Sequence, residues 1–146
     1  MGKKLDVDGW TVNDVMDLYV ADELCVDQRY QRKLVWNLSD KALFIDSLLK
    51  TFPIPNIMMV EYKEEDTDYS GYGIIDGLQR INALISFMIG EFPISIDGEN
   101  GYFDINSATG TLELQQQGKL QQKEPVLSRQ LCIDFRKYKL PIISTS

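Results

Sequence analysis

Residues 72–90 read YGIIDGLQRINALISFMIG, a short apolar strand followed at once by an amphipathic helix. The strand is predicted over residues 72–75 and the helix from Gly77 to about residue 89. Gly90 stands where a glycine commonly ends a helix. The apolar positions of the helix keep helical spacing, at Ile81, Leu84, Ile85, Met88 and Ile89. This strand-to-helix unit is the strongest structural signal in the sequence.

Two helices are predicted before this unit. Thr11 and Asp14 stand three residues apart in a capping-box pattern, so the first helix begins there. The second helix is predicted from Ser39 or Asp40 to about Thr51. Two prolines follow it closely and end it, because proline cannot continue the helical hydrogen-bond ladder.

The other apolar runs are predicted as strands, and with the helices they indicate an α+β fold. The strands are expected at residues 57–62, 92–96, 102–105, 131–135 and 140–145. Residues 111–124 are rich in glutamine, which fits either a solvated helix or an irregular stretch. No internal repeat or long linker divides the sequence, so a single domain over residues 1–146 is predicted. Because the sequence ends directly after a strand-like stretch, we expect it to be the N-terminal part of a longer protein.

Composition limits the function classes. The chain has 146 residues, of which 44% are hydrophobic and 25% charged, as in an ordinary globular domain. Its net charge is −7, whereas a non-specific nucleic-acid coat protein would be basic, so any nucleic-acid contact must be local. The N-terminus shows no signal peptide, and no apolar run approaches about 18 residues. We therefore expect a cytoplasmic protein without a membrane partner.

The absence of histidine excludes several kinds of active site. Without His, the chain cannot form a Ser-His-Asp triad, a Cys-His pair or the histidine of an HNH-type nuclease. Its two cysteines, Cys25 and Cys132, are far apart in sequence, and a reduced pair is favoured over a disulfide. Chemistry must therefore rest on carboxylates, Arg, Lys, Gln and hydroxyls, with Mg²⁺ as a candidate metal.

The first candidate site is the turn at residues 76–80, called the 76–80 turn below. Free N–H groups at the start of a helix form an anion site, and Gly77 lets a phosphate approach the backbone closely. Arg80 adds donors for phosphate oxygens, Asp76 could hold Mg²⁺ or orient water, and Gln79 could position that water. A simpler interpretation has Asp76 capping the helix, Arg80 pairing with it and Gln79 in solvent, with no ligand.

The second candidate site is the stretch of residues 29–36. It combines cations with aromatic side chains, namely Arg29, Tyr30, Arg32, Lys33 and Trp36. Such a set can bind a nucleotide base by stacking and its phosphates by charge. The alternative is a solvated loop that Trp36 anchors in the core.

Taken together, these segments resemble the DUF262 family. The motifs, in chain order, are Tyr30-Gln31-Arg32, Trp36, Phe-Pro-Ile-Pro at residues 52–55 and Ile-Asp-Gly-Leu-Gln-Arg at residues 75–80. DUF262 domains are the ParB/sulfiredoxin-like N-terminal domains of GmrSD- and SspE-type anti-phage restriction proteins. The resemblance covers residues 10–90, and residues 135–143 are also similar to the family.

The resemblance implies a nucleotide-binding domain, usually with NTP hydrolysis, in a modification-dependent DNA restriction system. Two segments resemble motifs of the family, one at Asp76, Gly77, Gln79 and Arg80 and the other at Gln31 and Arg32. Such proteins typically carry a C-terminal His-dependent nuclease domain, so DNA is an expected partner of the longer protein. The chain departs from the family at Gln28, where a proline is common, and at Leu78, where many members have a second Gln.

The leading hypothesis is therefore an Mg²⁺-dependent NTPase regulatory domain of a DNA restriction protein. Asp76, Gln79 and Arg80 are the predicted catalytic residues, and Asp76 is also the predicted metal ligand. The predicted nucleotide-binding residues are Gly77, Tyr30, Gln31 and Arg32. DNA cutting by this chain itself is not expected. Two alternatives stay open: a non-enzymatic module that senses DNA or a partner through residues 29–36, and a scaffold without a ligand.

Overall fold

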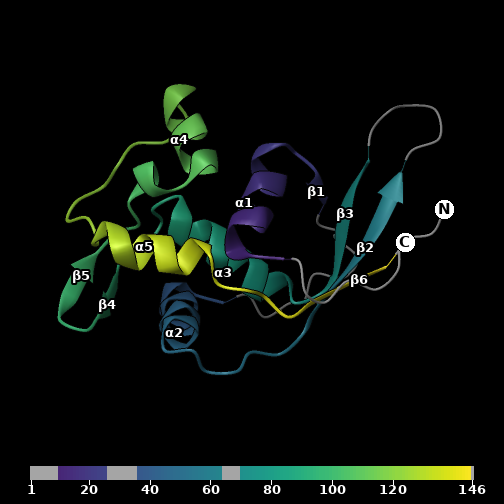
Figure 1. Ribbon diagram of the computed structural model, residues 1–146, viewed down its shortest axis with the longest axis horizontal. Helices are drawn as coiled ribbons and strands as arrows, with labels where there is room; N and C mark the ends of the chain where they lie inside the picture. Colours follow the sequence, from purple (N-terminus) through teal and green to yellow (C-terminus); the bar gives the residue numbers. More distant parts are fainter. Residues whose placement is uncertain (1–9, 26–35, 64–69, 146) are drawn as a thin grey trace.

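The strand-to-helix unit forms as predicted. The computed structural model describes residues 10–25, 36–63 and 70–145. Within it, β3 (Ser70–Asp76) leads through Gly77 into α3 (Leu78–Met88). Gly90 follows the helix with a φ of +82°, the left-handed conformation that favours glycine at this position. Most of α3 is buried, and Figure 1 shows it in the middle of the helices.

The two helices of the first half begin at capping boxes. α1 (Val12–Val20) is capped by Thr11 and Asp14, as predicted. α2 (Leu38–Leu49) is capped by Asn37, with Asp40 at the third helical position. The predicted start at Ser39 or Asp40 was therefore slightly late, because the Asn37–Asp40 pair satisfies two backbone N–H groups at once. Figure 1 shows α3 passing between α1 and α2, and both pack against it.

A small mixed sheet lies beside these helices (Figure 1). Its strand order is β1-β3-β2-β6, and its other strands are β1 (Leu24–Cys25), β2 (Ile57–Lys63) and β6 (Ile142–Thr145). β1 is parallel to β3, β2 is antiparallel to β3, and β6 is parallel to β2. The predicted strands at residues 57–62 and 140–145 are thus confirmed, as is the α+β class with a small mixed sheet and flanking helices.

The second predicted hairpin is shorter than expected. It consists of β4 (Ile94–Ile96) and β5 (Glu99–Gly101). Asp97 and Gly98 form its turn, both with positive φ, which suits the two-residue turns of hairpins. The prediction of a strand over residues 102–105 was wrong. Because the turn takes up only two residues, the returning strand begins at Glu99 and ends at Gly101.

Residues 131–135 were predicted as a strand but belong to α5 (Arg129–Arg136). The hydroxyl of Ser128 caps this helix, and Cys132 and Phe135 are its buried residues. A short apolar run does not distinguish a strand from one buried helical face, which explains the error. The Phe135 ring packs edge-on against Phe87 of α3, with 5.1 Å between ring centroids.

The glutamine-rich stretch is part helix and part irregular. α4 (Thr109–Gln116) follows the 3₁₀ helix η2 (Ile105–Ser107), and the chain beyond α4 is irregular up to α5. Gln122 fastens this irregular part: its Oε1 accepts from the Ile105 N–H and its Nε2 donates to the Phe103 carbonyl, both at 2.9 Å. No helix in the described part of the chain is long and apolar enough to cross a membrane.

Candidate functional site

A β-bulge and a glycine shape the 76–80 turn. The pairing of β3 with β2 shifts between Met58 and Met59, which leaves Ile75 as an extra residue. Gly77 follows with a φ of +99°. A Cβ at Gly77 would lie 2.9 Å from Cγ1 of Ile57, a fully buried side chain of β2. The turn therefore needs glycine for both its left-handed backbone and its close approach to β2.

The start of α3 has no side-chain cap. Gly77 is the N-cap residue, and no acidic residue lies in the first helical turn. The first intrahelical hydrogen bond runs from the Ile81 N–H to the Gly77 carbonyl at 3.0 Å. Asp76 does not cap the helix, which removes one part of the interpretation without a ligand. Free backbone N–H groups at a helix start, together with the helix dipole, are the general requirements for binding an anion there.

Arg80 lies against this helix start. Its Nη2 donates to the Asn56 carbonyl at 2.9 Å and is 3.9 Å from Asp76 Oδ2. The Arg80 side chain is 16% exposed, whereas that of Asp76 is 69% exposed. The Arg80 Nε–H is buried and has no hydrogen-bond partner among the described residues. The guanidinium is therefore positioned mainly by the Asn56 carbonyl, and it keeps unused donor capacity beside the turn.

Gln79 connects the turn to a distant segment. Its Oε1 accepts from the Trp36 N–H at 3.1 Å, across 43 residues of sequence. The Trp36 ring in turn packs on Phe44 of α2, with 5.6 Å between centroids. Gln79 is thus part of a tertiary hydrogen bond and is not merely solvated.

The other predicted nucleotide-binding residues, Tyr30, Gln31 and Arg32, lie outside the described residues. Cys25 and Trp36, which lie on either side of them in sequence, both contact the β3–α3 unit. Cys25 pairs with Gly73 of β3, and Trp36 bonds to Gln79 of α3. Trp36 of the second candidate site is therefore hydrogen-bonded to the first candidate site, whereas Cys25 lies beside the middle of β3.

The structure adds two groups to the turn that the sequence did not reveal. They are the Asn56 carbonyl, which holds Arg80, and the Trp36 N–H, which holds Gln79. Both are backbone groups, and any residue type can supply them. The residue types in the sequence therefore do not indicate which backbone groups meet the turn.

Cys132 has no place in this site. Cys132 is buried in α5, forms no disulfide, and accepts a hydrogen bond from the Asp104 N–H at 3.3 Å. Burial raises the pKa of its thiol to about 11. A thiol with such a pKa is a poor nucleophile at neutral pH, because the thiolate is the reactive form.

Comparison with known proteins identifies the family of the chain. Residues 17–141 match the family described as the N-terminal domain of the GmrSD restriction endonuclease. No curated protein and no solved structure matches the chain. The matched range covers most of the sequence, including α2, the whole mixed sheet except β6, and the 76–80 turn. The chain therefore belongs to the family of N-terminal domains of GmrSD restriction endonucleases.

Proposed function

We propose that this domain binds a nucleoside triphosphate at the 76–80 turn and hydrolyses it with Mg²⁺, as the regulatory domain of a DNA restriction protein. The observation that carries the proposal is the uncapped start of α3 with an arginine side chain beside it. Family membership supports the role in restriction. The proposal that the domain binds and hydrolyses a nucleotide is supported by the chemistry of the residues at the turn.

The triphosphate would be held by two kinds of donor. The N–H groups at the start of α3, which no side chain caps, would bind phosphate oxygens. Arg80 would add guanidinium donors and a positive charge. Because the Asn56 carbonyl already fixes one of its nitrogens, Arg80 would lose little conformational entropy on binding.

Mg²⁺ fits this turn only as an ion that arrives with the phosphates. The described residues contain no cluster of three or more acidic or cysteine side chains that could hold a metal. Mg²⁺ is commonly bound by one or two carboxylates together with substrate phosphates, and Asp76 supplies one exposed carboxylate. When bound, the ion would neutralise charge on the phosphoryl group that is transferred to water.

The remaining predicted residues have supporting roles in this proposal. Gln79 would position the attacking water, with its amide held by the Trp36 N–H. Tyr30, Gln31 and Arg32 would contact the nucleotide from the neighbouring stretch. DNA would be bound and cut elsewhere in a longer protein, because this chain has no histidine for a His-dependent nuclease.

Thermal unfolding with ATP, GTP, CTP or UTP and Mg²⁺ tests the proposal. A ligand that binds only the folded chain at a hundredfold excess over its Kd stabilises it by about 2.7 kcal/mol. One nucleotide should give such a gain in the parent, and Arg80→Ala should remove it relative to its own unliganded unfolding temperature.

Arg129→Ala is the matched control, because Arg129 also pairs with a carboxylate, Asp104 at 3.4 Å, but lies on α5. This control should keep the gain. Asp76→Ala should abolish phosphate release while the fold is retained. An equal gain in the parent and in Arg80→Ala, or unchanged phosphate release in Asp76→Ala, would refute the site.

A further inference from the structure

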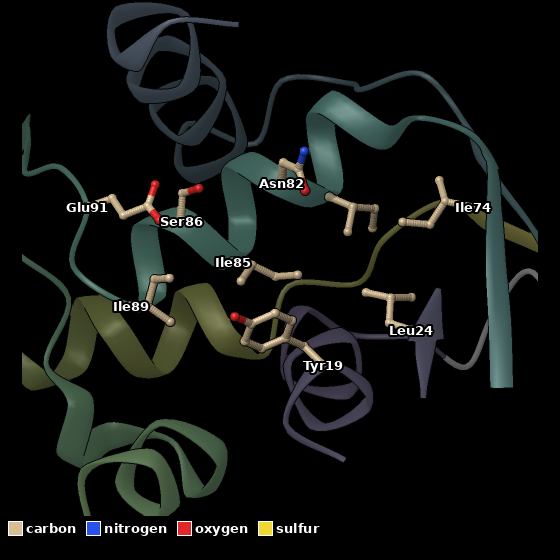
Figure 2. Close-up of a pocket in the computed structure, with 9 residues that line it drawn as sticks. Tyr19, Leu24, Ile74, Asn82, Ile85, Ser86, Ile89 and Glu91 are labelled. Atoms are coloured by element: carbon tan, nitrogen blue, oxygen red, sulfur yellow. The ribbon is translucent and has the colours of Figure 1, made fainter. Parts of the chain in front are cut away.

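A pocket lies between α1, β1 and α3, and its volume is about 220 Å³. Figure 2 shows Asn82, Ser86 and Glu91 along one side, with Tyr19 of α1 and Leu24 of β1 on the opposite side. Its floor is formed by the aliphatic side chains of Leu24, Ile74, Ile81, Ile85 and Ile89. The pocket thus combines an aliphatic floor, one aromatic ring and a polar side.

The polar side retains unused hydrogen-bonding capacity. Ser86 is only 6% exposed, and its Oγ accepts a hydrogen bond from Lys41 Nζ at 3.0 Å, which leaves the Ser86 hydroxyl hydrogen to donate. Lys41 Nζ is also 3.9 Å from Glu91 Oε1. The Asn82 amide, which offers both a donor and an acceptor, makes no hydrogen bond within the described part of the chain. Asn82 is partly buried, so its amide adds hydrogen-bonding groups to the polar side of the pocket.

This pocket is separate from the 76–80 turn. Residues on a helix are about 100° apart, so Asn82, Ser86 and Ile89 lie on the face of α3 roughly opposite Arg80. Arg80 points toward the Asn56 carbonyl, next to β2, whereas the pocket faces α1. A ligand here would leave the turn unoccupied.

We propose that this pocket binds a nucleobase, presented as a nucleoside. Its volume is below the range of drug-sized sites, so it suits a single small ring system. A base has flat apolar faces for the aliphatic floor and for stacking on Tyr19, which is 42% exposed. It also has an edge of adjacent donors and acceptors, which is what Asn82 and Ser86 can pair with. The inference goes beyond the triphosphate site and does not depend on it.

NMR titration of the ¹⁵N-labelled full chain with adenosine, guanosine, cytidine and thymidine tests the proposal. At least one nucleoside should shift amide signals of α1 and α3 in a saturable way. Asn82→Leu keeps the side-chain size but removes the amide, and it should weaken binding about tenfold, as expected for one lost hydrogen-bonded contact. Tyr19→Ala, at an exposed position, should weaken binding through lost stacking.

Inorganic tripolyphosphate separates this inference from the proposed function. It should stabilise the parent and Asn82→Leu but not Arg80→Ala, whereas the nucleoside should still bind Arg80→Ala. If none of the nucleosides shifts the amide signals of α1 and α3, the pocket assignment is overturned, whatever the result with tripolyphosphate. Equal nucleoside affinities of the parent and Asn82→Leu would likewise overturn it. So would a parent that binds toluene but none of the nucleosides.

Discussion

Gly77→Ala is expected to be strongly destabilising, and its cost can be worked out from the turn. An alanine with a φ near +99° costs about 1–2 kcal/mol, because its Cβ crowds the following carbonyl. The new Cβ would also lie 2.9 Å from Cγ1 of Ile57 and 3.2 Å from Arg80 Nη2. Ile57 is fully buried and cannot move away freely, so overpacking adds about 1–3 kcal/mol. The expected loss in the free energy of unfolding is about 2–5 kcal/mol.

Urea denaturation measures this loss, and Gly98→Ala is the matched control. Gly98 also has a positive φ, +81°, but a Cβ there would meet nothing within 4 Å. The control variant should lose only the backbone contribution, about 1–2 kcal/mol. The difference between the two variants isolates the contact of Gly77 with Ile57. Equal losses in both variants would refute the argument that close approach to β2 constrains the turn.

A double-mutant cycle checks the same contact independently. Ile57→Ala alone should cost about 2–5 kcal/mol, as expected for a fully buried aliphatic side chain. In the double variant with Gly77→Ala, the new methyl group enters the space that Ile57 leaves. The double variant should therefore lose about 1–3 kcal/mol less than the sum of the single variants. Strict additivity would show that the two side chains do not meet.

Three further predictions concern other parts of the chain. Partial burial, followed by neighbouring carboxylates, raises the pKa of Asp17, so the folded chain binds this proton more tightly than the unfolded chain. The free energy of unfolding should fall as pH rises from 3.8 through the folded pKa. Asp17→Asn should remove this fall and be more stable than the parent at neutral pH. Gln122→Ala should cost about 1–3 kcal/mol, because it leaves the Ile105 N–H and the Phe103 carbonyl without their partner, whereas Gln121→Ala, at an exposed position, should cost almost nothing. Cys132, with a pKa of about 11, should react slowly with iodoacetamide in the folded chain and rapidly in urea, as mapped by mass spectrometry.

Each of these three predictions has a contradicting result. Parallel pH profiles of the parent and Asp17→Asn would show that the Asp17 pKa is not raised by folding. Equal unfolding midpoints for the Gln122 and Gln121 variants would show that the Gln122 hydrogen bonds do not stabilise the irregular stretch. Alkylation of Cys132 at the same rate in the folded and unfolded chain would contradict its burial.

Local patterns predicted much of the first half of the fold. The Thr11–Asp14 capping box, the apolar periodicity of α3 and the glycine after it are signals that act within one or two helical turns. They therefore depend little on contacts with distant residues. The second half was harder, because the short apolar run at residues 131–135 fits a strand and a helix equally well. Packing of Phe135 against Phe87 selects the helix, and the sequence spacing contains no trace of that contact.

The sequence also predicted part of the candidate site, and the tertiary structure decided the rest. The sequence by itself determined that a strand meets a helix at Gly77, with Asp76, Gln79 and Arg80 around the turn, because residue type and spacing encode this local geometry. Tertiary structure decided what these side chains contact. Arg80 is held by a carbonyl 24 residues away and Gln79 by an N–H 43 residues away, whereas Asp76 stays largely exposed. Every residue has backbone groups of this kind, so only the folded arrangement of strands and helices selects which of them meet the turn.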